Sequence, residues 1–109
     1  MCAGFFAYGG FVTPEGKNVA YLKKRVKELG GECRKCSWDG HAGAPDWLIM
    51  LARPACHFWC EMKAPGERPR PIQRREIHIM QMAGCVVFVC DSPAEIDDML
   101  KIMTGDTLL

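Results

Sequence analysis

Apolar and polar positions alternate along the chain in patterns that predict its elements. Two short apolar runs, Trp47–Leu51 and His57–Cys60, flank the turn-like Ala52–Ala55 and predict a β-hairpin. Ahead of them, Thr13-Pro14-Glu15 combines an N-cap, a proline and a first-turn acid, and apolar residues then recur at helical spacing until Gly30. We therefore expect a helix from Thr13 to about Gly30, and a hairpin in the middle of the chain.

The remaining segments add two strands and two helices. Weak alternation over Glu32–Trp38 predicts a strand, and Cys85–Cys90 is apolar at every position, as is typical of a strand covered on both faces in the middle of a sheet. Helical spacing runs from about Pro71 to Ala83, and Ser92–Glu95 is a capping box that opens a last helix. The positions expected to face the core are Ile72, Ile79, Met80 and Ala83, then Ile96, Met99, Leu100 and Met103.

This element order, α-β-β-β-α-β-α, predicts an α/β fold with a mixed central sheet flanked by helices. A chain of 109 residues is long enough for one hydrophobic core and a single domain. We place that domain at residues 13–103, with an N-terminal tail or dimer-contact segment at 1–12 and a C-terminal tail at 104–109. The apolar first segment lacks a basic start and is shorter than the roughly 18 residues that span a bilayer, so no membrane association is expected.

Composition places few limits on function. The net charge of +1 argues neither for nor against nucleic acid, so local clusters of charge must decide. The seven cysteines are odd in number and irregularly spaced, and no secretory signal precedes them. We interpret them as free thiols in a reducing, cytoplasmic compartment.

The hairpin carries the candidate chemistry. Counting outward from the bond between Arg53 and Pro54 places Asp46 directly opposite Glu61, and Lys63 shares the face of Glu61. Facing carboxylates repel unless a cation lies between them. Such oxygens suit Mg²⁺ or Mn²⁺, and a neighbouring lysine can orient a water, which together suit phosphodiester hydrolysis. The alternative is an acid in a turn beside an exposed cross-strand pair.

Here the sequence resembles a known family. Pro45-Asp46, fourteen residues, and then Glu61-Met62-Lys63 match the PD-(D/E)xK nuclease signature. Thr13–Glu15, the Gly40–Asp46 loop, Glu61–Gly66 and Gln73 resemble, in order, the VRR-NUC (virus-type replication-repair nuclease) domain. The resemblance covers about Thr13 to Leu100, and the chain length is similar to the stand-alone form of phages and bacteria.

The resemblance implies both residue roles and an activity. Asp46 and Glu61 would bind the metal directly, with the Met62 carbonyl as a further ligand and Glu15 binding directly or through water. Lys63 would position the attacking water, and Gln73 would hydrogen-bond near it. The implied protein is a Mg²⁺- or Mn²⁺-dependent endonuclease of DNA repair without an organic cofactor. It would cut branched DNA such as four-way (Holliday) junctions as a homodimer, with Phe5-Phe6 and Phe11-Val12 as candidate interface residues.

Positive charge gathers immediately after the acids. The expected DNA contacts, besides Lys63, are Arg68, Arg70, Arg74 and Arg75, with Lys35 and the basic face of the first helix as weaker candidates. Phosphates are attracted to such a rim, and binding of this kind weakens steeply with salt. No base-reading element is recognisable, so we expect recognition through backbone and shape.

Two other classes of function remain open. One is a DNA-binding module whose acids are structural. The other is a zinc-stabilised scaffold built from Cys33, Cys36, Cys56 and Cys60 with His41 and His57. Against zinc, Cys33 and Cys36 are predicted on opposite faces of a strand, and Cys56 with Cys60 supplies only two ligands. A thiol protease lacks an evident base beside any cysteine.

Overall fold

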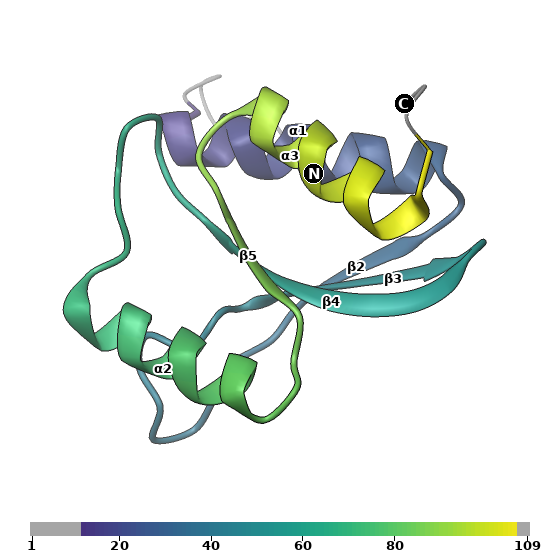
Figure 1. Cartoon of the computed structure of the whole chain (residues 1–109). Coiled ribbons are helices and arrows are strands. Elements are labelled where there is room, and N and C mark those ends of the chain that lie inside the picture. The colour runs from purple at the N-terminus through teal and green to yellow at the C-terminus, as the bar shows by residue number, and fades with distance from the viewer. Residues whose placement is uncertain (1–11, 107–109) are drawn as a thin grey trace.

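Three helices and a four-stranded sheet make up residues 12–106, the part of the chain that the computed structural model describes (Figure 1). The elements are α1 (Pro14–Glu28), β2 (Glu32–Lys35), β3 (Trp47–Ala52), β4 (Ala55–Met62), α2 (Pro71–Met82), β5 (Val87–Cys90) and α3 (Pro93–Thr104). This is the predicted order, and the α/β fold with a mixed sheet is confirmed. The N-terminal interface candidates Phe5, Phe6 and Phe11 lie outside the described residues, whereas Val12 is about half exposed.

The sheet has the order β2-β3-β4-β5, with antiparallel pairing up to β4 and parallel pairing of β4 with β5. The hairpin ladder pairs Trp47 with Cys60 and continues to Ala52 opposite Ala55. Only Arg53 and Pro54, joined by a cis peptide bond, remain in the turn. The turn is therefore two residues long instead of the four that the sequence indicated. The predicted register is confirmed, because the predicted and the observed turn are both centred between Arg53 and Pro54.

Helices cover the two faces of the sheet unequally. Helices α1 and α3 lie together on one side and α2 lies on the other (Figure 1). The larger core is formed under α1 and α3 by side chains such as Leu22, Ile49, Phe58, Ile96 and Leu100. On the opposite face, Ile77 and Met80 of α2 pack against Val87 and the half-buried Trp59. This second, smaller core leaves room on the same face for polar side chains.

Three expectations from the sequence are wrong. Strand β5 begins at Val87 and forms an edge of the sheet, with Val89 36% exposed. On α2, Ile77 faces inward with Met80, whereas Ile72 and Ile79 are 46% and 50% exposed and Ala83 is also exposed. The strand predicted to reach Trp38 ends at Lys35. On α2 the reason is that only Ile77 and Met80 reach the small core around Val87, which leaves Ile72 and Ile79 outside it.

The helix caps predicted at Thr13 and Ser92 are confirmed. Thr13 Oγ1 accepts a hydrogen bond from the Gly16 N–H at 3.0 Å, and Ser92 Oγ accepts one from the Glu95 N–H at 3.2 Å. The six described cysteines carry free thiols, as expected, and Cys60 is buried near Cys90. No helix within residues 12–106 is both long and apolar enough to cross a membrane.

Candidate active site

The acidic pair lies at one end of the hairpin. Continuing the ladder by one residue beyond Trp47 and Cys60 brings Asp46 opposite Glu61, on the sheet face that also carries Trp59. Glu61 is only 7% exposed, whereas the Asp46 side chain is 39% exposed and reaches solvent. The site therefore has one buried and one accessible carboxylate.

A glutamine from α2 joins Glu61 to Lys63. Gln73 Oε1 accepts hydrogen bonds from Lys63 Nζ at 2.6 Å and from the Arg70 N–H at 2.8 Å, while Gln73 Nε2 donates to Glu61 Oε2 at 3.0 Å. Lys63 Nζ also lies 3.7 Å from Glu61 Oε2. With two donors on its oxygen and a carboxylate beside its nitrogen, the amide has one favourable orientation. The three buried side chains form a fixed polar network.

The loop before β3 holds this network from the other side. Gly43 has φ of +97°, and a Cβ there would come within 3.3 Å of the Gln73 nitrogen. Trp38 Nε1 donates to the Pro45 carbonyl at 2.8 Å, which pins the residue ahead of Asp46. The glycine thus allows the loop to approach the start of α2.

Charge and burial together raise the pKa of Glu61 to about 7 from its ordinary 4.5. The largest cause is burial of the carboxyl group, and the charges of Asp46 and Glu15 raise the pKa further, whereas Lys63 lowers it. Glu15 is exposed in the first turn of α1, yet its charge acts on Glu61. Negative potential from three carboxylates therefore converges here, which favours binding of a cation.

The backbone beside the acids offers a further oxygen. Trp59 and Lys63 donate N–H groups to Val86 and Cys90, so the intervening Met62 directs its backbone groups toward β3. Continuing the ladder by two residues beyond Trp47 and Cys60 brings Pro45 opposite Met62, and proline has no N–H to donate to the Met62 carbonyl. This carbonyl and the two facing carboxylates are hard oxygen donors of the kind that Mg²⁺ and Mn²⁺ prefer, so the residues fit a divalent ion.

Asn18 was missed from the sequence. Its buried amide nitrogen donates to the Lys63 carbonyl at 2.9 Å and to the Asp91 carbonyl at 2.7 Å, which ties α1 to the ends of β4 and β5. Glu15 lies one turn earlier on the same helix, so this contact also places Glu15 relative to Lys63. The available signal was a polar residue on the buried stripe that continues with Leu22 and Val26.

The side chains of the predicted DNA-contact residues take no part in the Glu61–Gln73–Lys63 network. The arginines Arg68, Arg70, Arg74 and Arg75 are exposed. The loop that carries the first two is anchored where the Gly66 N–H donates to Asp91 Oδ2 at 2.9 Å, and Arg74 Nη1 donates to the Pro69 carbonyl. On the other side of the acids, Lys35 Nζ lies 3.9 Å from Asp46 Oδ2.

The residues considered for zinc are not assembled in one place. Cys33 pairs with Ile49 on the α1 side of the sheet, and Cys36 continues the ladder opposite Asp46 on the other side. His41 lies beside Glu76, at 3.6 Å, rather than beside a thiol. Between residues 12 and 106, no group of three or more His, Cys, Asp or Glu side chains is already gathered as a metal cluster.

Comparisons with known proteins show the family of this chain. No family model matches the sequence. The chain is 39% identical over 72 residues to "Putative nuclease p44" of Acyrthosiphon pisum secondary endosymbiont phage 1, an alignment covering 66% of this chain and 76% of that protein. A solved structure described as a VRR_NUC domain superposes with a TM-score of 0.75 at 36% identity, covering 83% of this chain and 97% of the other. The chain belongs to the VRR-NUC family of nucleases.

Proposed function

We propose that this chain is a divalent-metal-dependent endonuclease that cuts branched DNA, four-way junctions above all. The observation that carries the proposal is the buried network of Glu61, Gln73 and Lys63 opposite the accessible Asp46. Burial of charged groups is costly, and a surface hairpin would have no need of it. This free-energy cost is expected in an active site, which must hold charged side chains in fixed positions.

Asp46, Glu61 and the Met62 carbonyl would hold the metal ion, and Glu15 would act directly or through water. When bound, Mg²⁺ or Mn²⁺ supplies electrophilic stabilisation of the phosphodiester group. Lys63, with its ammonium oriented by Gln73 Oε1, would hold the attacking water. Gln73 would keep Glu61 turned toward the site through its own N–H.

DNA would reach the acids through the exposed arginines. Arg68 and Arg70 precede α2, and Arg74 and Arg75 lie in its first turns, so positive charge follows the acids in sequence. The Arg70 N–H also donates to the Gln73 amide that contacts Glu61 and Lys63. Such contacts are made to phosphates and carry no base specificity by themselves. Recognition by DNA shape is therefore the expected mode.

Preference for branched DNA and a homodimer follow from the family resemblance and from symmetry. A four-way junction is resolved by two symmetric cuts, and each chain supplies one set of acids. A two-fold dimer would place two such sets on one junction. A species that stays monomeric at micromolar concentration with junction DNA present would contradict this part of the proposal.

The deciding experiment is cleavage of end-labelled four-way junctions and linear duplexes with Mg²⁺, with Mn²⁺ and with a chelator. We expect metal-dependent cuts in the junction and loss of at least 100-fold in rate for Asp46→Asn and for Lys63→Met. Asp98→Asn, an exposed acid on α3, is the matched control and should cut normally. Binding without cleavage would favour the DNA-binding module instead, and zinc held in stoichiometric amounts would favour the scaffold.

A further inference from the structure

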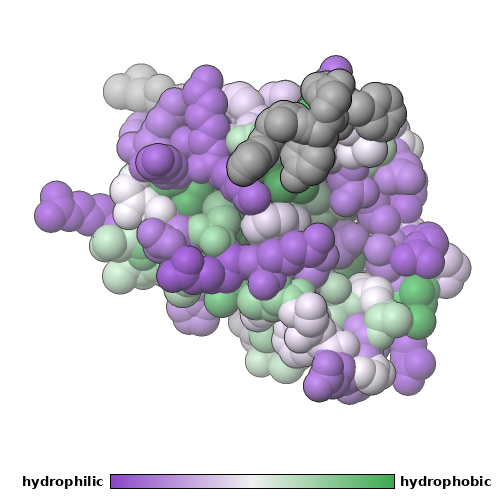
Figure 2. Space-filling view, turned by 180° about the vertical axis from the view of Figure 1, so that it is seen from behind, coloured by the Kyte–Doolittle hydropathy of each residue, from purple (hydrophilic) through white to green (hydrophobic). Residues whose placement is uncertain are grey.

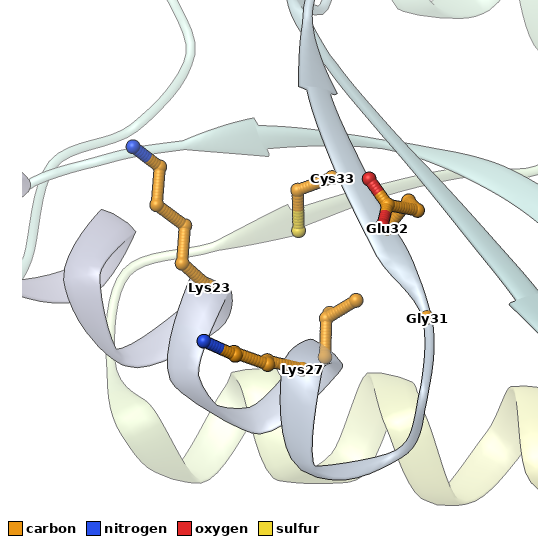
Figure 3. Close-up of a pocket in the computed structure, with 6 residues that line it drawn as sticks. Lys23, Lys27, Gly31, Glu32 and Cys33 are labelled. Atoms are coloured by element: carbon orange, nitrogen blue, oxygen red, sulfur yellow. The ribbon is translucent and has the colours of Figure 1, made fainter.

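A group of lysines lies on the other side of the acids from the arginine loop. Lys23 and Lys27, one turn apart, project from the same side of α1 over a hollow of about 230 Å³ between α1 and β2 (Figure 3). The Cys33 side chain points from β2 toward the helix in the same view. Burial raises the pKa of this thiol to about 11, so the hollow is lined by a neutral thiol, two ammonium groups and the carboxylate of Glu32.

Lys35 connects this surface to the acids. Lys23 Nζ and Lys35 Nζ lie 5.3 Å and 5.9 Å from the centre of the Trp47 ring, so both side chains pack on one indole. Lys35 Nζ is also 3.9 Å from Asp46 Oδ2. A continuous row of positive charge therefore runs from Lys27 through Lys23 and Lys35 to the acidic pair.

Two of the three lysines in this row have no acidic partner among residues 12–106, whereas Lys35 lies beside Asp46. Within residues 12–106, Lys23 and Lys27 form no ion pair, and the nearby Glu32 is engaged with Arg34 at 2.9 Å. On the opposite flank of the same helix, Arg25 is paired with both Glu28 and Asp97. Viewed from behind, the surface is mainly hydrophilic around a smaller hydrophobic area (Figure 2). The ammonium groups of Lys23 and Lys27, which face the hollow, are therefore available to an external anion.

We propose that Lys23, Lys27 and Lys35 form a second phosphate-binding surface, which holds the DNA backbone on the β2 side of the scissile position. The strand order separates this surface from the arginines, because β2 flanks β3 and the arginines follow β4. The acids lie between the two, so a duplex arm can be held on both sides of the cut. This inference rests on the proposed function, because its ligand is the same DNA. It adds the path that the DNA backbone takes across the protein.

The test measures binding with the divalent metal removed, so that it does not depend on cleavage. Full-length Lys23→Glu/Lys27→Glu is compared with Lys17→Glu/Lys24→Glu, a matched control with the same charge change on the exposed back of the same helix. We expect the first variant to bind labelled junction and duplex DNA at least tenfold more weakly than the control. Loss of two phosphate contacts should also reduce the slope of log K against log salt by about 1.8.

Chemical footprinting provides a second measurement without substitutions. Acetylation of the wild-type protein, read by mass spectrometry, should show Lys23, Lys27 and Lys35 protected by DNA while Lys24 still reacts. The proposed surface would be contradicted if Lys23 and Lys27 reacted equally with and without DNA and if Lys23→Glu/Lys27→Glu bound DNA as tightly as the control variant. A wild type that binds through these lysines but cuts nothing with Mg²⁺ or Mn²⁺ would instead overturn the proposed function and leave the surface standing.

Discussion

Gln73 donates its amide N–H to Glu61 Oε2 at 3.0 Å, so a residue of α2 fixes the rotamer of a carboxylate on β4. The same amide accepts from Lys63 Nζ at 2.6 Å. One neutral side chain thereby holds an anion and a cation that are 3.7 Å apart, and it keeps both directed to one side. This relationship makes the site sensitive to substitutions that leave every charged residue in place.

Gln73→Glu should abolish most of the activity. The change replaces a donor by a carboxylate beside Glu61, and it leaves the Arg70 N–H and Lys63 with a charged acceptor instead of an amide. We expect the cleavage rate to fall at least 100-fold, and Gln73→Ala to lower the free energy of unfolding by about 1–3 kcal/mol. Gln81→Glu, a glutamine of the same helix bonded only to the Val87 carbonyl, is the control and should cut normally. Normal cutting by Gln73→Glu would show that the network does not position the catalytic groups.

Glu61 should make the metal-free protein less stable as pH rises. Its folded-state pKa is raised to about 7 from 4.5, so the folded state holds the proton more tightly than the unfolded state. The stability that this group contributes is complete below pH 4.5 and is lost as pH rises through 7. Calorimetry in chelator between pH 5 and 8 should show the Tm of the wild type falling relative to that of Glu61→Gln. A difference between the two that is constant with pH would contradict this assignment.

Adding a divalent ion should reverse that trend. The ion binds the ionised carboxylate, so it competes with the proton and stabilises the folded state more at pH 8 than at pH 5. A Kd about 100-fold below the Mg²⁺ concentration would add about 2.7 kcal/mol to the free energy of unfolding. We expect the Tm gained with 5–10 mM Mg²⁺ to be smaller in Asp46→Asn. A gain in Tm that is the same in Asp46→Asn would place the ion elsewhere.

Asn18→Leu should separate stability from positioning. It removes both donors to the Lys63 and Asp91 carbonyls, and we expect the free energy of unfolding to fall by about 2 kcal/mol. Activity should fall further than the unfolded fraction explains, because the contact that positions Glu15 of α1 relative to Lys63 is lost. The control is Tyr21→Phe, a change on the same helix as Asn18 that removes hydrogen bonds to Asp97 of α3 and should lower stability alone. Equal activity in the two folded variants would make Asn18 a structural residue only.

The hairpin shows what the sequence could determine. Its register depends on local pairing around Arg53 and Pro54, and the alternation of apolar residues fixes the faces, so the approach of Asp46 and Glu61 was predictable. The helix caps at Thr13 and Ser92 are similarly local. Features that depend on a few neighbouring residues could therefore be predicted from the sequence.

The face of α2 and the position of β5 were not accessible in this way. Ile72, Ile77 and Ile79 are equally apolar, and the choice of Ile77 as the inward residue depends on its packing against Val87 on a distant strand. An all-apolar run such as Cys85–Cys90 is compatible with a central or an edge strand, because its sequence does not show whether another strand pairs on each side of it. The contact of Gln73 with Glu61 depends on the same docking of α2, and the sequence had indicated only a hydrogen bond near Lys63 through the family resemblance.

Pro45→Ala should weaken the response to metal through the backbone. Alanine restores an N–H opposite Met62, and that N–H can donate to the carbonyl that proline leaves without a β3 partner. We expect the Mg²⁺ concentration for half-maximal cleavage to rise severalfold, with a smaller effect on the rate at saturating Mg²⁺. The control is Pro65→Ala in the exposed loop after Lys63, and rates are compared well below the Tm of each variant because Pro45 is buried. If Pro45→Ala responds to Mg²⁺ as the control does, the Met62 carbonyl does not serve as a ligand, and the two facing carboxylates must bind the ion without it.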